Sequence, residues 1–429
     1  MPEFRTPVLR RGSRSARGLF PLLAMTALFF GLAFAPPGDA AQRQKVLIKT
    51  VEVGAPGNPS IGVVPFSDAI YESCADAPSS KQGCQTIGGV DYRYAIGQLE
   101  VTNAQWVKFL NTIDPSGRKS HRLYARTQSS SRWPEYGSIN HRKRARPGRH
   151  YKVASRQWAQ KPYAFATFLS AARFANSLSN GKVLKEKTSK ANGVKVTSYT
   201  VRLSRNSNRG MYNMKNRRTT RTAKRGFVVP SQDEWVKAAY FDPTGGGTYS
   251  YWKYPTNEGV FGDGTATAPN PTVLDFDSGK VTNGTDQPLA GFKPSSGPTP
   301  NWCPTAAQLT ATTCSTTNPF KIPSSAYAKI YVGGVATVGG AGTPSPWGTL
   351  DQGGNAVEWT DTITLPPSKR ADGKGRVWRR LHGGISNSTA YQMWPSAVGL
   401  NPQDNFAFAR TYPWLGIRIG VIGKLKVKG

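Results

Sequence analysis

The sequence predicts a mixed domain built from many short helices and strands joined by turns. Its 429 residues include 45 Gly and 32 Pro, and only 19% of them are charged. That composition does not suit a helical bundle or a regular alternation of helices and parallel strands. Three segments still have the apolar spacing and end signals of helices. The length suits one large irregular domain or two ordinary ones, with an ample core.

The first 41 residues are predicted to be a signal peptide. Five arginines precede the apolar run Leu19–Ala35, and the small residues Gly38 and Ala40 suit cleavage near Ala40 or Ala41. An uncleaved anchor is the alternative, because the apolar run is close to the shortest length that spans a bilayer. No later segment is apolar enough to cross a membrane. We therefore expect an exported protein, periplasmic or extracellular, with no transmembrane span in the mature chain.

Residues 42–90 are predicted to form a lead that carries a small disulfide loop. The four cysteines occur as two local pairs, Cys74 with Cys84 and Cys303 with Cys314. In the oxidising compartment of an exported protein, such pairs favour two loop-closing disulfides. A four-thiolate metal site is the alternative, and the wide spacing within each pair argues against it.

The main domain is predicted over residues 91–424 and contains three helices. The first follows a strand-like stretch and is capped by Thr102 or Asn103. The second lies within residues 162–181, where Gly181 is the stop signal. The third begins at Ser231, which forms an S-x-x-E capping box with Glu234. Each helix has an aromatic face, for which core packing is the simplest explanation.

Two strongly basic insertions separate these helices, and we expect both to be exposed loops, the second with a strand or hairpin. Residues 118–152 contain eleven Lys or Arg and one acid, and residues 182–225 contain fourteen and one. The simplest explanation is a solvated surface. The alternative is a site for an anionic glycan or an acidic surface, because a field of one sign attracts polyanions. Export argues against nucleic acid as a specific partner, so an anionic glycan or an exported protein is expected.

Five motifs, in order, resemble the formylglycine-generating-enzyme or sulfatase-modifying-factor family. They are IGQLEVTNAQWVKFLN, VPSQDEWVKAAYFDP, DQGGNAVEWTD, LHGGIS and GIRIG, spread over Ile96–Gly420. The resemblance implies a C-type-lectin-like α+β fold with small twisted antiparallel sheets, a few helices and much irregular loop. It leaves out the leader and the two basic insertions.

The resemblance also implies a structural calcium ion in the acidic loop Asp351–Asp361. Four residues would bind it, two through carboxylates and two through main-chain carbonyl oxygens: Asp351, Glu358, Gly354 and Ala356. Six to eight hard oxygen ligands from a flexible loop suit calcium. A turn without metal is the alternative. Asn355 and Asp361 would shape the loop, and Trp359 would lie in the core.

The chain departs from the family at the catalytic centre. The two cysteines that oxidise the substrate and hold copper fall on Ser388 and Met393. Neither a hydroxyl nor a thioether can replace a thiolate, so we expect no formylglycine generation by that route. A candidate ligand cleft would contain four residues from this part of the chain: His382, Ser388, Met393 and Arg410.

Another branch of the superfamily binds a non-haem iron through histidines. This chain has four histidines without metal-binding spacing, and three of them lie in the first basic insertion, where surface positions are expected. Copper or iron is therefore not expected. Three hypotheses remain. One is a calcium-stabilised protein that binds an anionic glycan or exported partner. The second is a metal-dependent oxidase of the formylglycine-generating type with an exported substrate, and the third is a structural protein of an outer surface.

Overall fold

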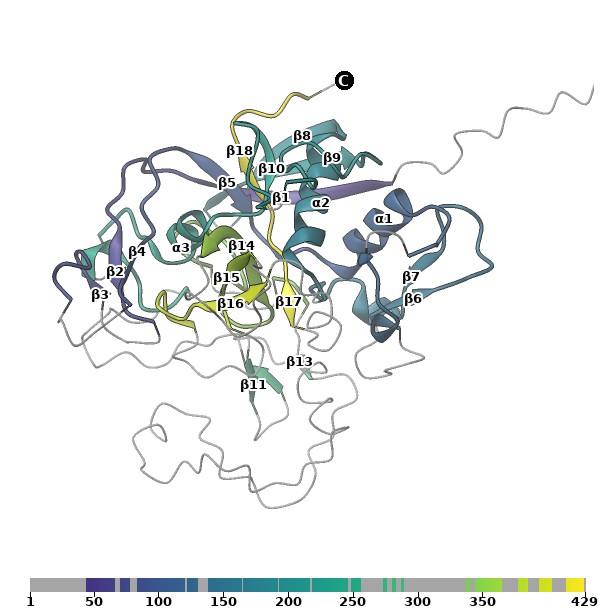
Figure 1. The fold of residues 1–429 in the computed structure, drawn as a ribbon. Coiled ribbons are helices and arrows are strands. Elements are labelled where there is room, and N and C mark those ends of the chain that lie inside the picture. The colour runs from purple at the N-terminus through teal and green to yellow at the C-terminus, as the bar shows by residue number, and fades with distance from the viewer. Residues whose placement is uncertain are drawn as a thin grey trace, which may run out of the picture. The chain divides into compact units, whose positions relative to one another are not determined.

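The computed structural model describes most of the chain between residues 44 and 427 (Figure 1). The described residues are 44–65, 70–77, 83–119, 122–129, 138–163, 165–191, 193–216, 218–245, 248–255, 273–275, 280–282, 287–288, 337–339, 344–364, 377–384, 393–402 and 414–427. The predicted signal peptide, His121, the Cys303–Cys314 pair, Ser388 and Arg410 lie outside them. Among the described residues, no helix has the length and apolar character needed to cross a bilayer.

A six-stranded antiparallel sheet is the largest element, with the strand order β10-β18-β5-β1-β9-β8. Its strands are β1 (Lys45–Val53), β5 (Tyr94–Gly97), β8 (Lys182–Ala191), β9 (Val194–Arg202), β10 (Gly226–Val228) and β18 (Gly420–Ile422). Strand β1 comes from the predicted lead and pairs with both β5 and β9. Strand β18, near the end of the chain, pairs with β5 and β10, so distant parts of the sequence close one sheet.

The remaining described strands form small sheets. A four-stranded sheet consists of β16 (Gly399–Pro402), β15 (Trp378–His382), β14 (Val357–Thr364) and β17 (Leu415–Gly416), with β14 and β17 parallel. The others combine β2 (Ile61–Val63), β3 (Ile70–Tyr71) and β4 (Gln85–Ile87); β6 (Ile139–His141) and β7 (Tyr151–Val153); and β11 (Val273–Asp275), β12 (Lys280–Thr282) and β13 (Gln287–Pro288). Small sheets with few helices confirm the α+β prediction.

All three predicted helices are present, and each begins with a reciprocal capping box. They are α1 (Asn103–Ile113), α2 (Phe168–Ser179) and α3 (Gln232–Tyr240). Thr102 caps α1, Thr167 caps α2, and Ser231 pairs with Glu234 at the start of α3, as the sequence predicts. Three single turns of 3-10 helix complete the described elements: η2 (Arg126–Gln128), η3 (Arg156–Trp158) and η4 (Thr248–Ser250).

The aromatic faces of the helices form the core, as predicted. Trp106 of α1 stacks on Tyr163 with ring centroids 4.0 Å apart and also packs against Phe109 and Phe174. These rings join the buried face of the six-stranded sheet in one large cluster. A second cluster packs residues of α3, such as Trp235, against β2 and β4. The acidic loop contacts both clusters, because its Trp359 belongs to the first and its Glu358 accepts a hydrogen bond from Trp235 of the second.

The basic insertions are not simply exposed loops, so that expectation is wrong in part. In the first, Tyr124 and Tyr151 are buried, and β6 and β7 form a hairpin beside α1. In the second, β8 and β9 form the predicted hairpin, which extends the six-stranded sheet. Apolar and aromatic residues alternate with the basic ones, so one face of each hairpin can be buried while the other stays charged. A count of charges alone does not reveal that alternation.

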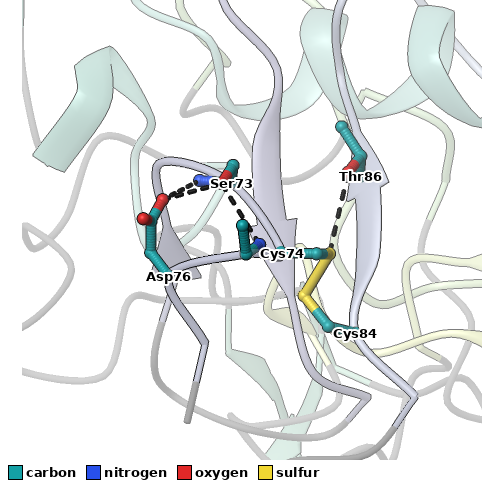
Figure 2. Close-up of a disulfide and its surroundings, with 6 residues drawn as sticks. Ser73, Cys74, Asp76, Cys84 and Thr86 are labelled. Atoms are coloured by element: carbon teal, nitrogen blue, oxygen red, sulfur yellow. Dashed lines mark hydrogen bonds between the residues drawn. A yellow bond between two sulfur atoms is a disulfide. The ribbon is translucent and has the colours of Figure 1, made fainter. Parts of the chain in front are cut away.

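Cys74 and Cys84 form a disulfide, which confirms one predicted pair (Figure 2). It closes the segment between β3 and β4. At its base, the backbone N–H and the hydroxyl of Ser73 donate hydrogen bonds to Asp76 at 2.9 and 2.7 Å. No cysteine in the described part of the chain is free.

Candidate functional site: the acidic loop and the buried histidine

The acidic loop leads into β14 through a backbone held in an uncommon conformation. Asp351, Gly354 and Asn355 have φ values of 59°, 82° and 57°, in the left-handed region that Gly, Asn and Asp adopt most readily. Side chains of the loop fix it to its surroundings. Asn355 Nδ2 donates to Glu100 Oε2 at 2.7 Å, and Gln352 Nε2 donates to the carbonyl of Trp235 at 3.1 Å.

Glu358 forms a buried ion pair with Arg418, a residue of the GIRIG motif. Arg418 Nε lies 3.0 Å from both carboxylate oxygens, and its Nη2 lies 2.8 Å from Oε1. Trp235 Nε1 donates to Oε2 at 2.7 Å. Each oxygen of Glu358 therefore accepts two N–H groups. Arg418 also donates to the carbonyls of Gly97 and Leu350, and neither partner of the ion pair is exposed.

The predicted calcium set can be compared with this geometry. A cation bound to Glu358 would compete with a guanidinium that already neutralises the carboxylate, so the Glu358 side chain does not fit the ligand role. Asp351 is buried and accepts the backbone N–H of Gly339 through Oδ2. Within the described ranges, no group of three His, Cys, Asp or Glu residues is placed to hold a metal ion. Calcium binding through Asp351, Gly354 and Ala356 stays a prediction.

Glu100, from the first motif, is a third buried acid beside this loop. It is 2% exposed, and its Oε1 has no hydrogen-bond partner. Burial raises the pKa of Glu100 well above its usual value, and the neighbouring acids Asp351 and Glu358 raise it further. The raised pKa favours the protonated form of Glu100 beside the Glu358–Arg418 ion pair.

Asp361, the last acid of the loop motif, belongs to a separate network. Its Oδ2 accepts the Nε–H of Arg221 and the hydroxyl of Tyr212, and Arg221 also donates to both oxygens of Glu234. Trp359 lies in the core as predicted and donates to the carbonyl of Ala166 at 2.9 Å. The acids of the motif are thus bonded inside the protein, two of them to arginines.

His382 and Met393 are the described members of the predicted ligand cleft, and both are buried. The ring of His382 stacks on Trp235 with centroids 5.1 Å apart, and neither ring nitrogen has a hydrogen-bond partner. Burial, with a smaller effect of Arg380, lowers the pKa of His382 to about 3. The main-chain carbonyl of Met393 accepts the hydroxyl of Tyr240 at 2.7 Å. His382 and Met393 therefore both contact residues of α3, His382 through its neutral ring and Met393 through its main-chain carbonyl.

The other described histidines are not surface residues, so that expectation is wrong. His150 is buried, and its Nδ1 lies 2.9 Å from the carbonyl of Arg142. His141 is half-buried, and its Nε2 lies 2.8 Å from the carbonyl of Gly117. Each ring is bonded to a main-chain carbonyl, so both stabilise the β6–β7 hairpin. Exposed cations gather in the turn of that hairpin, where Arg142, Lys143 and Arg144 are exposed.

Sequence reasoning missed Glu100 and Arg418, although both lie inside motifs that it singled out. Their roles depend on contacts between distant parts of the chain. Glu100 accepts a hydrogen bond from Asn355, 255 positions away, and Arg418 donates to Glu358, 60 positions away. No local spacing reveals such contacts. The signal that could have found them is a charged residue flanked by apolar ones, Glu100 between Leu99 and Val101 and Arg418 between Ile417 and Ile419, because a buried charge needs a partner.

Comparison with known proteins supports the family suggested by these motifs. The family described as "Sulfatase-modifying factor enzyme 1-like domain" matches residues 89–419. No curated protein sequence matches the chain. Among solved structures, the chain is similar to Treponema denticola variable protein 1, with 15% identity and a TM-score of 0.38 over 87% of this chain and 95% of that one. It is also similar to PvdO from Pseudomonas aeruginosa, with 10% identity and a TM-score of 0.37 over 88% and 94%. Because the family match spans well over half of the sequence, this chain belongs to the sulfatase-modifying factor enzyme 1-like domain family.

Proposed function

We propose that this protein is an exported member of the family that binds an anionic glycan and does not generate formylglycine. The observation that supports it best is the set of exposed cations on strand β1 and on the β8–β9 hairpin, in a protein that buries several of its acids. Such a surface attracts polyanions over a distance of about one Debye length, roughly 8–10 Å in physiological salt.

The absence of formylglycine chemistry rests on the cysteine positions. One corresponds to Met393, which is buried with its carbonyl bonded to Tyr240, and the other corresponds to Ser388. A thioether cannot form the mixed disulfide that the family reaction requires. In the part of the chain that the structure describes, both cysteines belong to a disulfide, which accords with an oxidising compartment.

Calcium is an addition to this proposal that metal analysis can test. Asp351 and the main-chain oxygens of Gly354 and Ala356 would be its ligands from the predicted set, with Glu358 left to Arg418. The binding surface does not depend on that ion, because its cations lie on other strands.

A metal-dependent oxidase acting on an exported substrate is the second candidate. The observation in its favour is His382, a fully buried imidazole with two unpartnered nitrogens. Unpartnered buried polar atoms are costly and need an explanation, such as a ligand or a metal. Copper or iron bound at near-unit occupancy in the purified protein, and lost in His382→Leu, would favour this candidate.

Affinity for defined polysaccharides tests the leading proposal. The full chain, expressed in a host that can export it, would be titrated with heparin, a polyuronate and neutral dextran at several salt concentrations. We expect binding to the two anionic polymers, weakening steeply with salt, and none to dextran. Equal binding to dextran, or no binding to any polyanion at 50 mM salt, would contradict the proposal.

A further inference from the structure

The exposed face of strands β1, β9 and β8 carries a regular array of cations. The pairing register places residues of the three strands side by side in rows, and Figure 1 shows β8 and β9 beside β1. Three successive rows lie on the same face, each with one residue from β1, one from β9 and one from β8. The first row contains Lys45, Arg202 and Lys182; the second contains Leu47, Thr200 and Lys185; the third contains Lys49, Ser198 and Lys187. We call these nine residues the cationic sheet face. Adjacent strands lie about 4.8 Å apart and successive rows about 7 Å apart.

The two faces of these strands differ sharply in charge. On the opposite face, Val46, Ile48 and Val201 are buried in the core. The acids Glu52 and Glu186 also belong to that opposite register, where Glu52 pairs with Lys195. The cationic sheet face therefore has six Lys or Arg residues and no acid. Lys45, Lys49, Lys185, Lys187 and Arg202 are exposed.

This arrangement costs stability in the free protein. Like charges directly opposite one another on neighbouring strands repel, and the first row places three cations in line. Lysines on a free edge strand can prevent sheet-to-sheet aggregation, which would account for β8. It does not account for Arg202, because β9 pairs with both β1 and β8 at that position, whereas Lys45 and Lys49 lie in the half of β1 that pairs with β9 alone. A polyanion that neutralises the rows would relieve the repulsion.

We propose that an extended anionic polysaccharide lies across the cationic sheet face, and this inference rests on the proposed function. Thr200 and Ser198 place hydroxyl groups between the cations, and Leu47, 46% exposed, offers an apolar contact for a sugar ring. No aromatic residue belongs to the nine, whereas proteins that bind single-stranded nucleic acid combine a basic groove with aromatic stacking. The face also spans three paired strands, which is wider than the α-helix or two-stranded ribbon that the major groove of a duplex admits.

A hollow beside β1 extends this surface toward α1. Its volume is about 280 Å³, and its lining includes Leu47 and Lys49 of the cationic sheet face together with Gln105 and Lys108 of α1. Glu100 also lines it; its Oε2 accepts a hydrogen bond from Asn355, and burial raises its pKa, which favours the uncharged form. The hollow gives a bound chain a place for one sugar unit beside the array.

The β6–β7 turn provides a matched control. The sheet variant replaces Lys45, Lys49, Lys185 and Lys187 by Gln, and the control variant replaces Arg142, Lys143, Arg144 and Arg146 by Gln. Both lose four exposed charges, so their net charge is equal. Circular dichroism and thermal unfolding would verify the fold of each variant before binding is measured with heparin, duplex DNA and single-stranded DNA.

We expect the sheet variant to bind heparin at least 10-fold more weakly than the wild type at 150 mM salt. The control variant should lose less than about 3-fold in heparin affinity. The salt slope of the sheet variant should fall by about one unit per lost contact. Equal losses in both variants, with wild-type binding intact, would overturn the sheet face but leave the proposed function standing. Absence of wild-type binding would overturn both. Tighter binding of DNA than heparin, lost in the sheet variant, would overturn the polysaccharide as ligand.

Discussion

Replacing Arg418 by Met tests whether the acidic loop is held by an internal cation. The guanidinium is fully buried and donates to Glu358, Gly97 and Leu350. Removing one partner of a buried ion pair leaves an uncompensated charge and costs about 3–5 kcal/mol. The two main-chain carbonyls would also lose a donor, at about 1–3 kcal/mol each, although such costs do not add fully. We expect a loss of at least 3 kcal/mol in the free energy of unfolding.

Urea unfolding followed by tryptophan fluorescence measures this loss. The control is Glu358→Gln, which keeps an acceptor for Trp235 Nε1 but carries no charge. In that background Arg418→Met should cost less, with a coupling energy of about 2 kcal/mol or more for a buried charged pair. A loss below 1 kcal/mol, or the same loss in both backgrounds, would refute the assignment.

The same urea-unfolding assay also tests whether bound calcium stabilises the loop. If Arg418 is the sole cation of the loop, chelation with EDTA should leave the wild-type unfolding midpoint unchanged. A bound ion at 100 times its dissociation constant stabilises by about 2.7 kcal/mol, so a midpoint that falls on chelation would show that calcium contributes. The result therefore decides between an arginine alone and an arginine beside a metal.

Three further predictions concern single sites. His382 is neutral when folded with a pKa of about 3, so the unfolded chain binds its proton first and stability falls as pH drops below 6.5. His382→Leu should remove about 2 kcal/mol of the loss between pH 7 and 5 in urea titrations at both pH values. The pH dependence from Glu100 has the opposite sign. Because its pKa is raised in the folded state, stability is lost as the pH rises above the pKa of Glu100 in the unfolded chain. The stability of Glu100→Gln relative to wild type should therefore increase from pH 5 to 9 in thermal unfolding. Joint replacement of Cys74 and Cys84 by Ser opens a loop with a sequence separation of 10 and should lower the unfolding free energy by about 2–3 kcal/mol, measured against wild type with and without reductant.

Local signals in the sequence predicted the elements whose causes are local. The capping box at Ser231 and Glu234, the short-range pair Cys74 and Cys84, and the aromatic stripe at Trp106 all act within a few turns of chain. The register of β1 could not be predicted, because its partners lie up to 157 positions away. The same limit applies to the site. The loop was recognised, but the role of Glu358 depends on Arg418 and Trp235, which only the fold brings together.

The distribution of arginine explains why so basic a chain concentrates acid beside glycines and a tryptophan. Glu358 is neutralised by Arg418, while Glu234 and Asp361 share Arg221, so a buried arginine and a half-buried one hold three acids of the interior. The chain has 56 Lys and Arg against 24 Asp and Glu, and among the Lys and Arg residues that the structure describes only Lys237, Arg379 and Arg418 are buried. A surface that only needed solubility would mix the two signs, because repulsion within one sign costs stability. A row of cations that includes Arg202, on a strand with partners on both sides, is hard to explain as solvation alone, and an anionic ligand explains it.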